Sequence, residues 1–114
     1  MQVSVIGDPD DTVVVAVRGN LDHGSATVLG TTLDQVLDRP APRVVVDVSG
    51  IGICDPVGLR SFLTGHERAR AAGGWLRLAA PGGSLLALLD AAGLTSRLDV
   101  RPSVADAVAA APDL

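Results

Sequence analysis

The sequence predicts a single α/β domain with a mixed, mostly parallel sheet covered by helices, in the order β-β-α-β-α-β-α-β-α. Three observations support this fold class. Runs of β-branched residues alternate with runs whose apolar residues recur at helical spacing. Short segments rich in glycine and proline separate these runs. The chain has 114 residues, 47% of them apolar, which is enough for one core but not for two. We therefore expect residues 1–114 to form one domain.

The chain begins with a predicted β-hairpin. Residues 2–6 alternate modestly between apolar and polar types, as an edge strand does, and residues 12–17 are mostly β-branched. Residues 7–11 consist of glycine, proline and aspartate, which favour a turn. Residues 18–22 are expected to end the second strand.

A helix and a central strand are predicted next. Apolar residues recur at helical spacing over residues 26–37, and Pro40 and Pro42 stop that helix. Residues 43–48 are nearly all valine after the first, interrupted by Asp47. A strand that is apolar on both faces is typical of the centre of a sheet that helices cover.

The junction between this strand and a second helix lies at Asp55. A short loop containing glycine precedes it, and Asp55 is placed to cap the helix while Pro56 occupies its first position. Gly73 and Gly74 stop the helix. A helix that begins at the end of a strand is where α/β folds often place functional groups. We therefore expect the function to centre on this junction.

Two further β-α units complete the predicted fold. Residues 75–79 form a strand, and the following helix opens at Pro81-Gly82-Gly83-Ser84 and ends at Gly93. Residues 97–100 form a short last strand. A variant capping box at Ser103 starts the final helix. The residues expected to face inward on that helix are Val104, Ala107, Val108 and Ala111.

Composition and charge exclude several classes of protein. The net charge of -4, the pI near 4.8 and the near absence of aromatic residues argue against binding to nucleic acid. A single cysteine, Cys54, excludes an intramolecular disulfide and a zinc site built on several cysteines. The first residues lack the basic and apolar regions typical of a signal peptide, so none is expected, and no apolar run is long enough to cross a membrane. We expect a cytoplasmic protein without direct membrane insertion.

Four short segments together carry a family resemblance. They are Gly19-Asn20-Leu21-Asp22, Asp47-Val48-Ser49-Gly50, Asp55-Pro56-Val57-Gly58-Leu59 and Leu89-Asp90-Ala91-Ala92-Gly93-Leu94. None is specific alone, but their order and spacing extend over nearly the whole chain. In this respect the chain resembles the STAS domain, the fold of bacterial anti-sigma factor antagonists.

The resemblance implies a regulatory binding protein and not an enzyme. Such antagonists bind an anti-sigma factor with a GHKL-type kinase fold and thereby release a sigma factor for transcription. In the family, the partner phosphorylates the Ser or Thr that follows the motif aspartate, and phosphorylation breaks the complex. Here that position is Pro56, followed by Val57, and neither residue has a hydroxyl group. The resemblance therefore implies docking without phosphorylation control at Pro56.

The expected docking surface comprises the start of the second helix, its polar face and one residue at the rim. Its candidate residues are Asp22, Asp55, Pro56, Val57, Gly58, Arg60, Ser61 and Thr64. Asp55 is expected to cap the helix and could contact a partner as well. Asp22 could line the same surface or only cap the segment that follows it.

Several polar residues near the junction have two interpretations. Ser49, Ser61 or Thr64 could be a displaced phosphorylation site, but a turn at Ser49 and an exposed helix face for Ser61 and Thr64 are the favoured interpretation. Cys54 could be a redox switch, because a helix start lowers a thiol pKa, or a small buried apolar residue. Asp47 is expected to order the following loop by accepting hydrogen bonds from backbone N–H groups.

Two other functions fit the same fold. One is a soluble STAS subunit of a membrane transporter of the lipid ABC type, and the other is a nucleotide-binding module. His23 and His66 do not have the spacing of metal ligands, and no nucleophile elbow is present. We expect neither a cofactor nor a metal, and self-association as a homodimer stays open.

Overall fold

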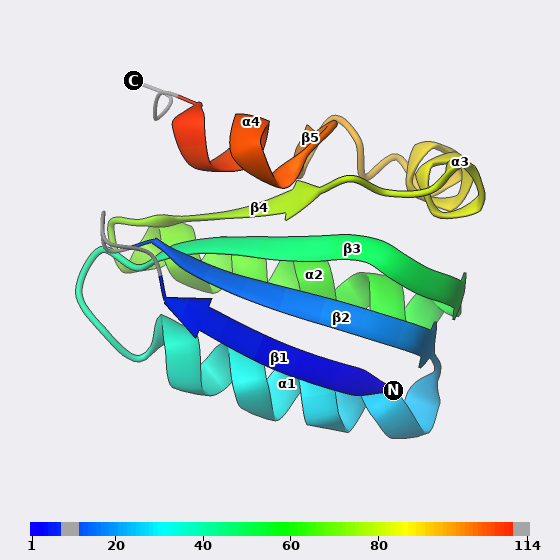
Figure 1. Cartoon of the computed structure of the whole chain (residues 1–114), viewed down its shortest axis with the longest axis horizontal. Helices are drawn as coiled ribbons and strands as arrows, with labels where there is room; N and C mark the ends of the chain where they lie inside the picture. The colour runs from blue at the N-terminus through cyan, green and yellow to red at the C-terminus, as the bar shows by residue number, and fades with distance from the viewer. Residues whose placement is uncertain (8–11, 111–114) are drawn as a thin grey trace.

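The computed structural model describes residues 1–7 and 12–110, which form five strands and four helices (Figure 1). In chain order the elements are β1 (Gln2–Gly7), β2 (Val13–Leu21), α1 (His23–Leu37), β3 (Arg43–Cys54), α2 (Pro56–Ala71), β4 (Trp75–Ala79), α3 (Gly83–Ala91), β5 (Asp99–Arg101) and α4 (Val104–Ala109). This order confirms the predicted fold class. Positions 8–11 of the expected first turn and Ala111 of the expected last helix lie outside the described residues.

The strands form one mixed sheet in the order β1-β2-β3-β4-β5. β1 pairs with β2 antiparallel, and the other neighbouring strands pair parallel. Helices α1 and α2 lie side by side under one face of the sheet, and α4 lies on the other face (Figure 1). The strand β3 is therefore central and covered on both faces, as its run of valines predicted.

Alternate side chains of β3 supply both halves of the core. Val44, Val46 and Val48 join the large cluster under α1 and α2, whereas Val45 packs with Ala107 of α4. Phe62 of α2 is fully buried in the larger cluster. Since burial of apolar surface dominates folding energetics, this cluster fixes α2 against the sheet.

The strands β2 and β3 continue beyond their predicted ends at residues 17 and 48. The glycine-containing segment after Val48 was expected to be a loop, and that expectation is wrong. A Cβ atom at Gly50 would lie 2.8 Å from the Cγ of Arg18, so glycine allows the two strands to approach closely here. The side-chain oxygen of Asn20 also accepts a hydrogen bond of 3.1 Å from the N–H of Ile53. Two register shifts carry the pairing to Leu21 and Cys54.

Arg77 of β4 attaches α4 to the sheet. Its side chain is 2% exposed, and its guanidinium lies 3.7 Å from the centre of the Trp75 ring. It donates hydrogen bonds to Asp99 at 3.0 Å and to the carbonyl of Ala107 at 2.7 Å. A buried charge needs such partners, and the sequence analysis did not assign this role to Arg77.

Candidate functional site

Helices α1 and α2 begin side by side at one end of the sheet. The last residues of β2 and β3, Leu21 and Cys54, are paired with each other. Asp22 and Asp55 follow directly and are the N-cap residues of α1 and α2. The N–H of Asp55 donates a hydrogen bond of 3.0 Å to the carbonyl of Leu21. Because β2 and β3 are parallel and end side by side, both capping carboxylates lie at the carboxyl-terminal end of these strands.

The start of α2 has the predicted geometry. The side chain of Asp55 accepts a hydrogen bond of 2.9 Å from the N–H of Gly58, and Pro56 is the first helical residue. Gly58 is buried, and a Cβ atom there would lie 2.5 Å from the Cγ of Leu21. Gly58 therefore lets α2 approach the end of β2, and it was expected among the docking residues without this structural role.

Asp22 caps α1 through a reciprocal pair of hydrogen bonds. Its side chain accepts one of 2.9 Å from the N–H of Ser25, whose hydroxyl accepts one of 2.8 Å from the N–H of Asp22. The backbone bond from Ser25 is the main reason that the pKa of Asp22 lies below its ordinary value. Since this cap forms, α1 begins at His23, and the predicted start at residue 26 is wrong.

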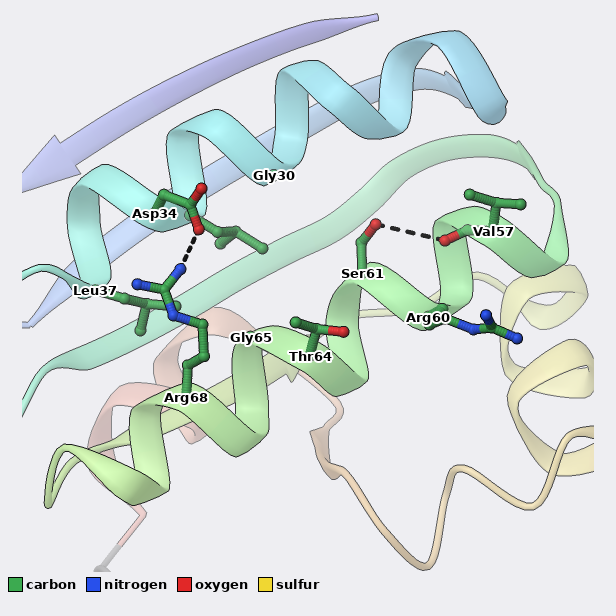
Figure 2. Close-up of a pocket in the computed structure, with 10 residues that line it drawn as sticks. Gly30, Asp34, Leu37, Val57, Arg60, Ser61, Thr64, Gly65 and Arg68 are labelled. Atoms are coloured by element: carbon green, nitrogen blue, oxygen red, sulfur yellow. Dashed lines mark hydrogen bonds and ion pairs between the residues drawn. The ribbon is translucent and has the colours of Figure 1, made fainter.

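A shallow hollow, which we call the α1–α2 groove, runs between the two helices and has a volume of about 240 Å³ (Figure 2). From α2 it is lined by four of the predicted residues. They are Val57, Arg60, Ser61 and Thr64. An ion pair between Arg68 and Asp34 lies across one end of the groove (Figure 2). The predicted polar face of α2 is therefore one wall of a groove.

The opposite wall of the groove comes from α1, which the sequence analysis did not include. Its lining residues there are Gly30, Leu33, Asp34 and Leu37. Leu33 and Leu37 are buried core residues whose spacing predicted only a packed helix face. Gly30 within the predicted helix was the one signal in the sequence, because glycine destabilises a helix interior relative to alanine and leaves space on the helix surface.

The hydroxyl groups of Ser49, Ser61 and Thr64, all near Pro56 in the sequence, lie in different environments. Ser61 donates a weak hydrogen bond of 3.4 Å to the carbonyl of Val57 and sits in the groove. Thr64 is exposed one turn further along α2. Ser49 is in an Asx-type turn, where its N–H donates a bond of 3.0 Å to the carboxylate of Asp47. Asp47 thus orders the following backbone as expected.

Cys54 is buried directly before the α2 cap. Burial, with a further contribution from the charge of Asp55, raises the pKa of its thiol to about 11. The thiol stays protonated at neutral pH, whereas a reactive cysteine is a thiolate. The environment of Cys54 therefore favours a buried apolar role over a redox switch.

The site offers contact surface and hydrogen-bonding groups. Within residues 1–7 and 12–110, no cluster of His, Cys, Asp and Glu could hold a metal ion. In the same part of the chain, no helix is long and apolar enough to span a membrane. His66 is half-buried on the opposite side of α2 from the groove, next to Trp75 and Arg77.

Comparisons with known proteins agree with this architecture. The family model described as Mlab, STAS domain matches residues 5–102. A candidate anti-sigma factor antagonist from Thermotoga maritima superposes with a TM-score of 0.85 at 16% identity, over 93% of this chain and 91% of that one. An anti-sigma factor antagonist from Mycobacterium paratuberculosis gives a TM-score of 0.79 at 24% identity, over 94% and 92%.

A protein of a transporter family has the same fold. A sulfate transporter family protein from Wolinella succinogenes gives a TM-score of 0.76 at 18% identity, over 91% of this chain and 86% of that one. No curated protein matches the sequence. At these identities the solved structures establish similarity of fold, and the matched family model covers most of the chain.

Proposed function

The chain belongs to the STAS domain family, and we propose that it is a binding protein that docks through the start of α2 onto an anti-sigma factor with a GHKL-type kinase fold. Docking would release a sigma factor and so regulate transcription in the cytoplasm. The protein would act by contact, without catalysis of its own. The anti-sigma factor antagonists of the same fold support this choice of partner.

The exposed face of the first turns of α2 is the observation that carries the proposal. Pro56, Val57 and Arg60 are all exposed, although apolar residues such as Val57 usually avoid water. Asp55 and Gly58 hold the backbone beneath them in place. A rigid, exposed and partly apolar helix face is typical of a docking surface.

Control of docking would not depend on phosphorylation at position 56. Proline keeps the first turn helical but provides no hydroxyl to accept a phosphoryl group. We therefore expect the protein to bind its partner constitutively. The variant Pro56→Ser, incubated with ATP and a partner kinase that binds the wild type, should take up phosphate and lose binding. A folded variant that takes up no phosphate would show that this site differs from a family phosphosite by more than one residue.

The docking role can be tested with two matched valines. Val57 is 45% exposed at the start of α2, and Val28 is 52% exposed on α1 without lining the groove. Val57→Asp should weaken binding to the purified GHKL-fold regulator from the same organism at least tenfold by calorimetry, whereas Val28→Asp should not. Absence of binding by the wild type, or equal losses in both variants, would overturn the proposal.

A second candidate is a STAS subunit that stabilises a membrane transporter, including one of the lipid ABC type. The sulfate transporter family protein with the same fold favours this alternative. Co-purification with a permease or its ATPase, but not with a GHKL-fold regulator, would support the second candidate. A third possibility from the sequence, nucleotide binding, predicts measurable affinity for ATP or GTP by calorimetry.

A further inference from the structure

Arg60 lies between two apolar hollows that open on either side of α2. On one side is the α1–α2 groove, where glycines on both helices, Gly30 and Gly65, leave room (Figure 2). On the other side, toward α3, is a hollow of about 160 Å³, which we call the α3-side hollow. Its lining residues are Pro56, Leu59, Arg60, Leu63, Ala92 and Leu94. Arg60 is the residue of α2 that lines both hollows.

The charge of Arg60 is not neutralised within the described part of the chain. Among those residues, its guanidinium forms no hydrogen bond or ion pair, and the residue is exposed. Arg68, two turns further along the same helix, pairs with Asp34. A guanidinium presents a planar set of donors that matches a carboxylate in two parallel hydrogen bonds. Arg60 is therefore available to a carboxylate from outside the chain.

Exposed apolar side chains lie at the same end of the molecule as this cation (Figure 1). Ile53, two residues before the α2 cap, is 69% exposed, and Val57 is 45% exposed. Leu86 of α3, the helix at the same end of the molecule, is 39% exposed (Figure 1). Contiguous exposed apolar residues commonly mark a contact surface. The surface thus combines one positive charge with apolar contacts on both sides of it.

We propose that this surface recognises a helical segment of a partner protein that presents one carboxylate flanked by two apolar side chains. The carboxylate would pair with Arg60, and the apolar side chains would enter the α1–α2 groove and the α3-side hollow. Residues four apart lie on one helix face, so a single helix can present this apolar-acidic-apolar series. This inference rests on the docking role proposed above and specifies the chemistry of the partner.

Charge and shape favour a protein segment over a polyanion. The chain has a net charge of -4, which opposes a nucleic acid or another dense array of phosphates. The exposed surface that lines both hollows is mainly apolar, and Asp55 with its carboxylate lies about one turn from Arg60. A single carboxylate with aliphatic neighbours fits these surroundings.

The experiment uses a synthetic helical peptide with a central Glu and a Leu one turn before and one turn after it. Its analogue carries Gln in place of Glu. Each peptide is titrated into the isotopically labelled full chain and followed by amide chemical shifts. We expect the Glu peptide to shift the amide signals of Gly30, Val57 and Leu63. It should bind roughly tenfold more tightly than the Gln peptide, because its carboxylate forms a charge-assisted hydrogen bond.

Two arginine variants on α2 identify the contact. Arg60→Gln should weaken the Glu peptide roughly tenfold and leave the Gln peptide unchanged, which is the signature of a direct pair in a double-mutant cycle. Arg70→Gln removes another exposed cation of α2 that lines neither hollow, and it should change nothing. Equal affinity of the two peptides, equal binding by Arg60→Gln, or no binding at all would overturn the proposal. The proposal would also be overturned if the amide signals of the same residues shifted with protein concentration in the absence of peptide, because a second copy of the chain would then occupy the surface.

Failure of this inference is distinguishable from failure of the docking role. If the GHKL-fold regulator binds the wild type and Arg60→Gln equally well, recognition through Arg60 is wrong and docking stands. If the peptides behave as expected but no regulator binds, the docking role is wrong and recognition of a carboxylate stands.

Discussion

The two halves of α2 differ in how their charges are satisfied, although both line the same groove. In the C-terminal half, Arg68 pairs with Asp34 of α1, and Glu67 lies 3.6 Å from Arg97. In the N-terminal half, Arg60 has no such partner among the described residues, and Val57 beside it is exposed. Of the two arginines of α2 that line the groove, Arg68 is thus paired within the chain and Arg60 is not. Arg70, which lies outside the groove, is exposed, and its side chain has no partner among the described residues either.

This difference indicates how one helix serves both stability and recognition. Charges paired on the surface contribute little to stability, but they leave nothing for a partner to satisfy. An unpaired guanidinium beside apolar side chains gains more from binding, because a partner supplies both the carboxylate and the exclusion of water. The N-terminal half of α2 is consequently where a change should affect binding most.

The largest effect on stability is expected from Gly58, which lies in the N-terminal half of α2 against Leu21. In Gly58→Ala, the new Cβ would lie 2.5 Å from the Cγ of Leu21 and 3.1 Å from its carbonyl oxygen. Because α2 or the end of β2 must shift, we expect the free energy of unfolding to fall by about 1–3 kcal/mol. Urea unfolding followed by circular dichroism measures this loss.

Gly65 is the matched control in the middle of the helix. A Cβ atom there would lie 3.0 Å from the Cδ1 of Leu76, which is the mobile end of a side chain. Alanine also favours a helix over glycine by about 1 kcal/mol. Gly65→Ala should therefore change stability by less than Gly58→Ala, and equal losses would contradict the assignment of a special role to Gly58.

The next largest effect is expected at the cap of α2. Asp55→Ala removes the acceptor for the N–H of Gly58, and we expect a loss of about 1 kcal/mol in the free energy of unfolding. Asp55→Asn keeps an acceptor oxygen and should lose much less. Hydrogen exchange at the Gly58 amide reports the change locally, and unchanged protection in Asp55→Ala would show that the cap contributes nothing.

The sequence was sufficient for the fold because local patterns and packing agree over most of the chain. The valines of β3 and the apolar spacing of α2 gave the correct elements, and Asp55 with Pro56 marked the start of α2. The wrong start predicted for α1 missed the local cap formed by Asp22 and Ser25. The wrong ends predicted for β2 and β3 lie where contacts between strands decide the structure. Gly50 and Gly52, which favour a loop locally, instead allow β3 to pass close to Arg18 and Asn20 of β2.

The candidate site was only half predictable for a similar reason. The face of α2 follows from helical periodicity, so Val57, Arg60 and Thr64 could be grouped from the sequence alone. The wall formed by Gly30 and Leu33 depends on how α1 packs against α2, which no local pattern specifies. The pairing of Arg68 with Asp34, and the absence of such a partner for Arg60 within the described residues, likewise required the structure.

A small effect is expected from the ion pair in the C-terminal half of α2. Asp34→Ala removes the partner of Arg68, but both side chains are largely exposed, so the loss should be roughly a few tenths of a kcal/mol. Arg60→Gln should leave stability unchanged, since it breaks no hydrogen bond or ion pair with a described residue. Thermal unfolding of both variants tests this. A large loss of stability in Arg60→Gln would mean that Arg60 stabilises the fold and is not available to bind a partner.

At neutral pH no effect on stability is expected from Cys54, and its effect is confined to high pH because folding raises the pKa of its thiol from 9.0 to about 11. Well below pH 9.0 the thiol is protonated in both the folded and the unfolded chain, and it adds no pH dependence. As the pH rises from 9.0 toward 11, the unfolded chain loses this proton first, so the free energy of unfolding falls. The chain contains no Lys and no Tyr, so few other groups titrate in this window. Cys54→Ala should remove the decline measured by urea unfolding, and a decline of the same size in that variant would show that the thiol is not its cause.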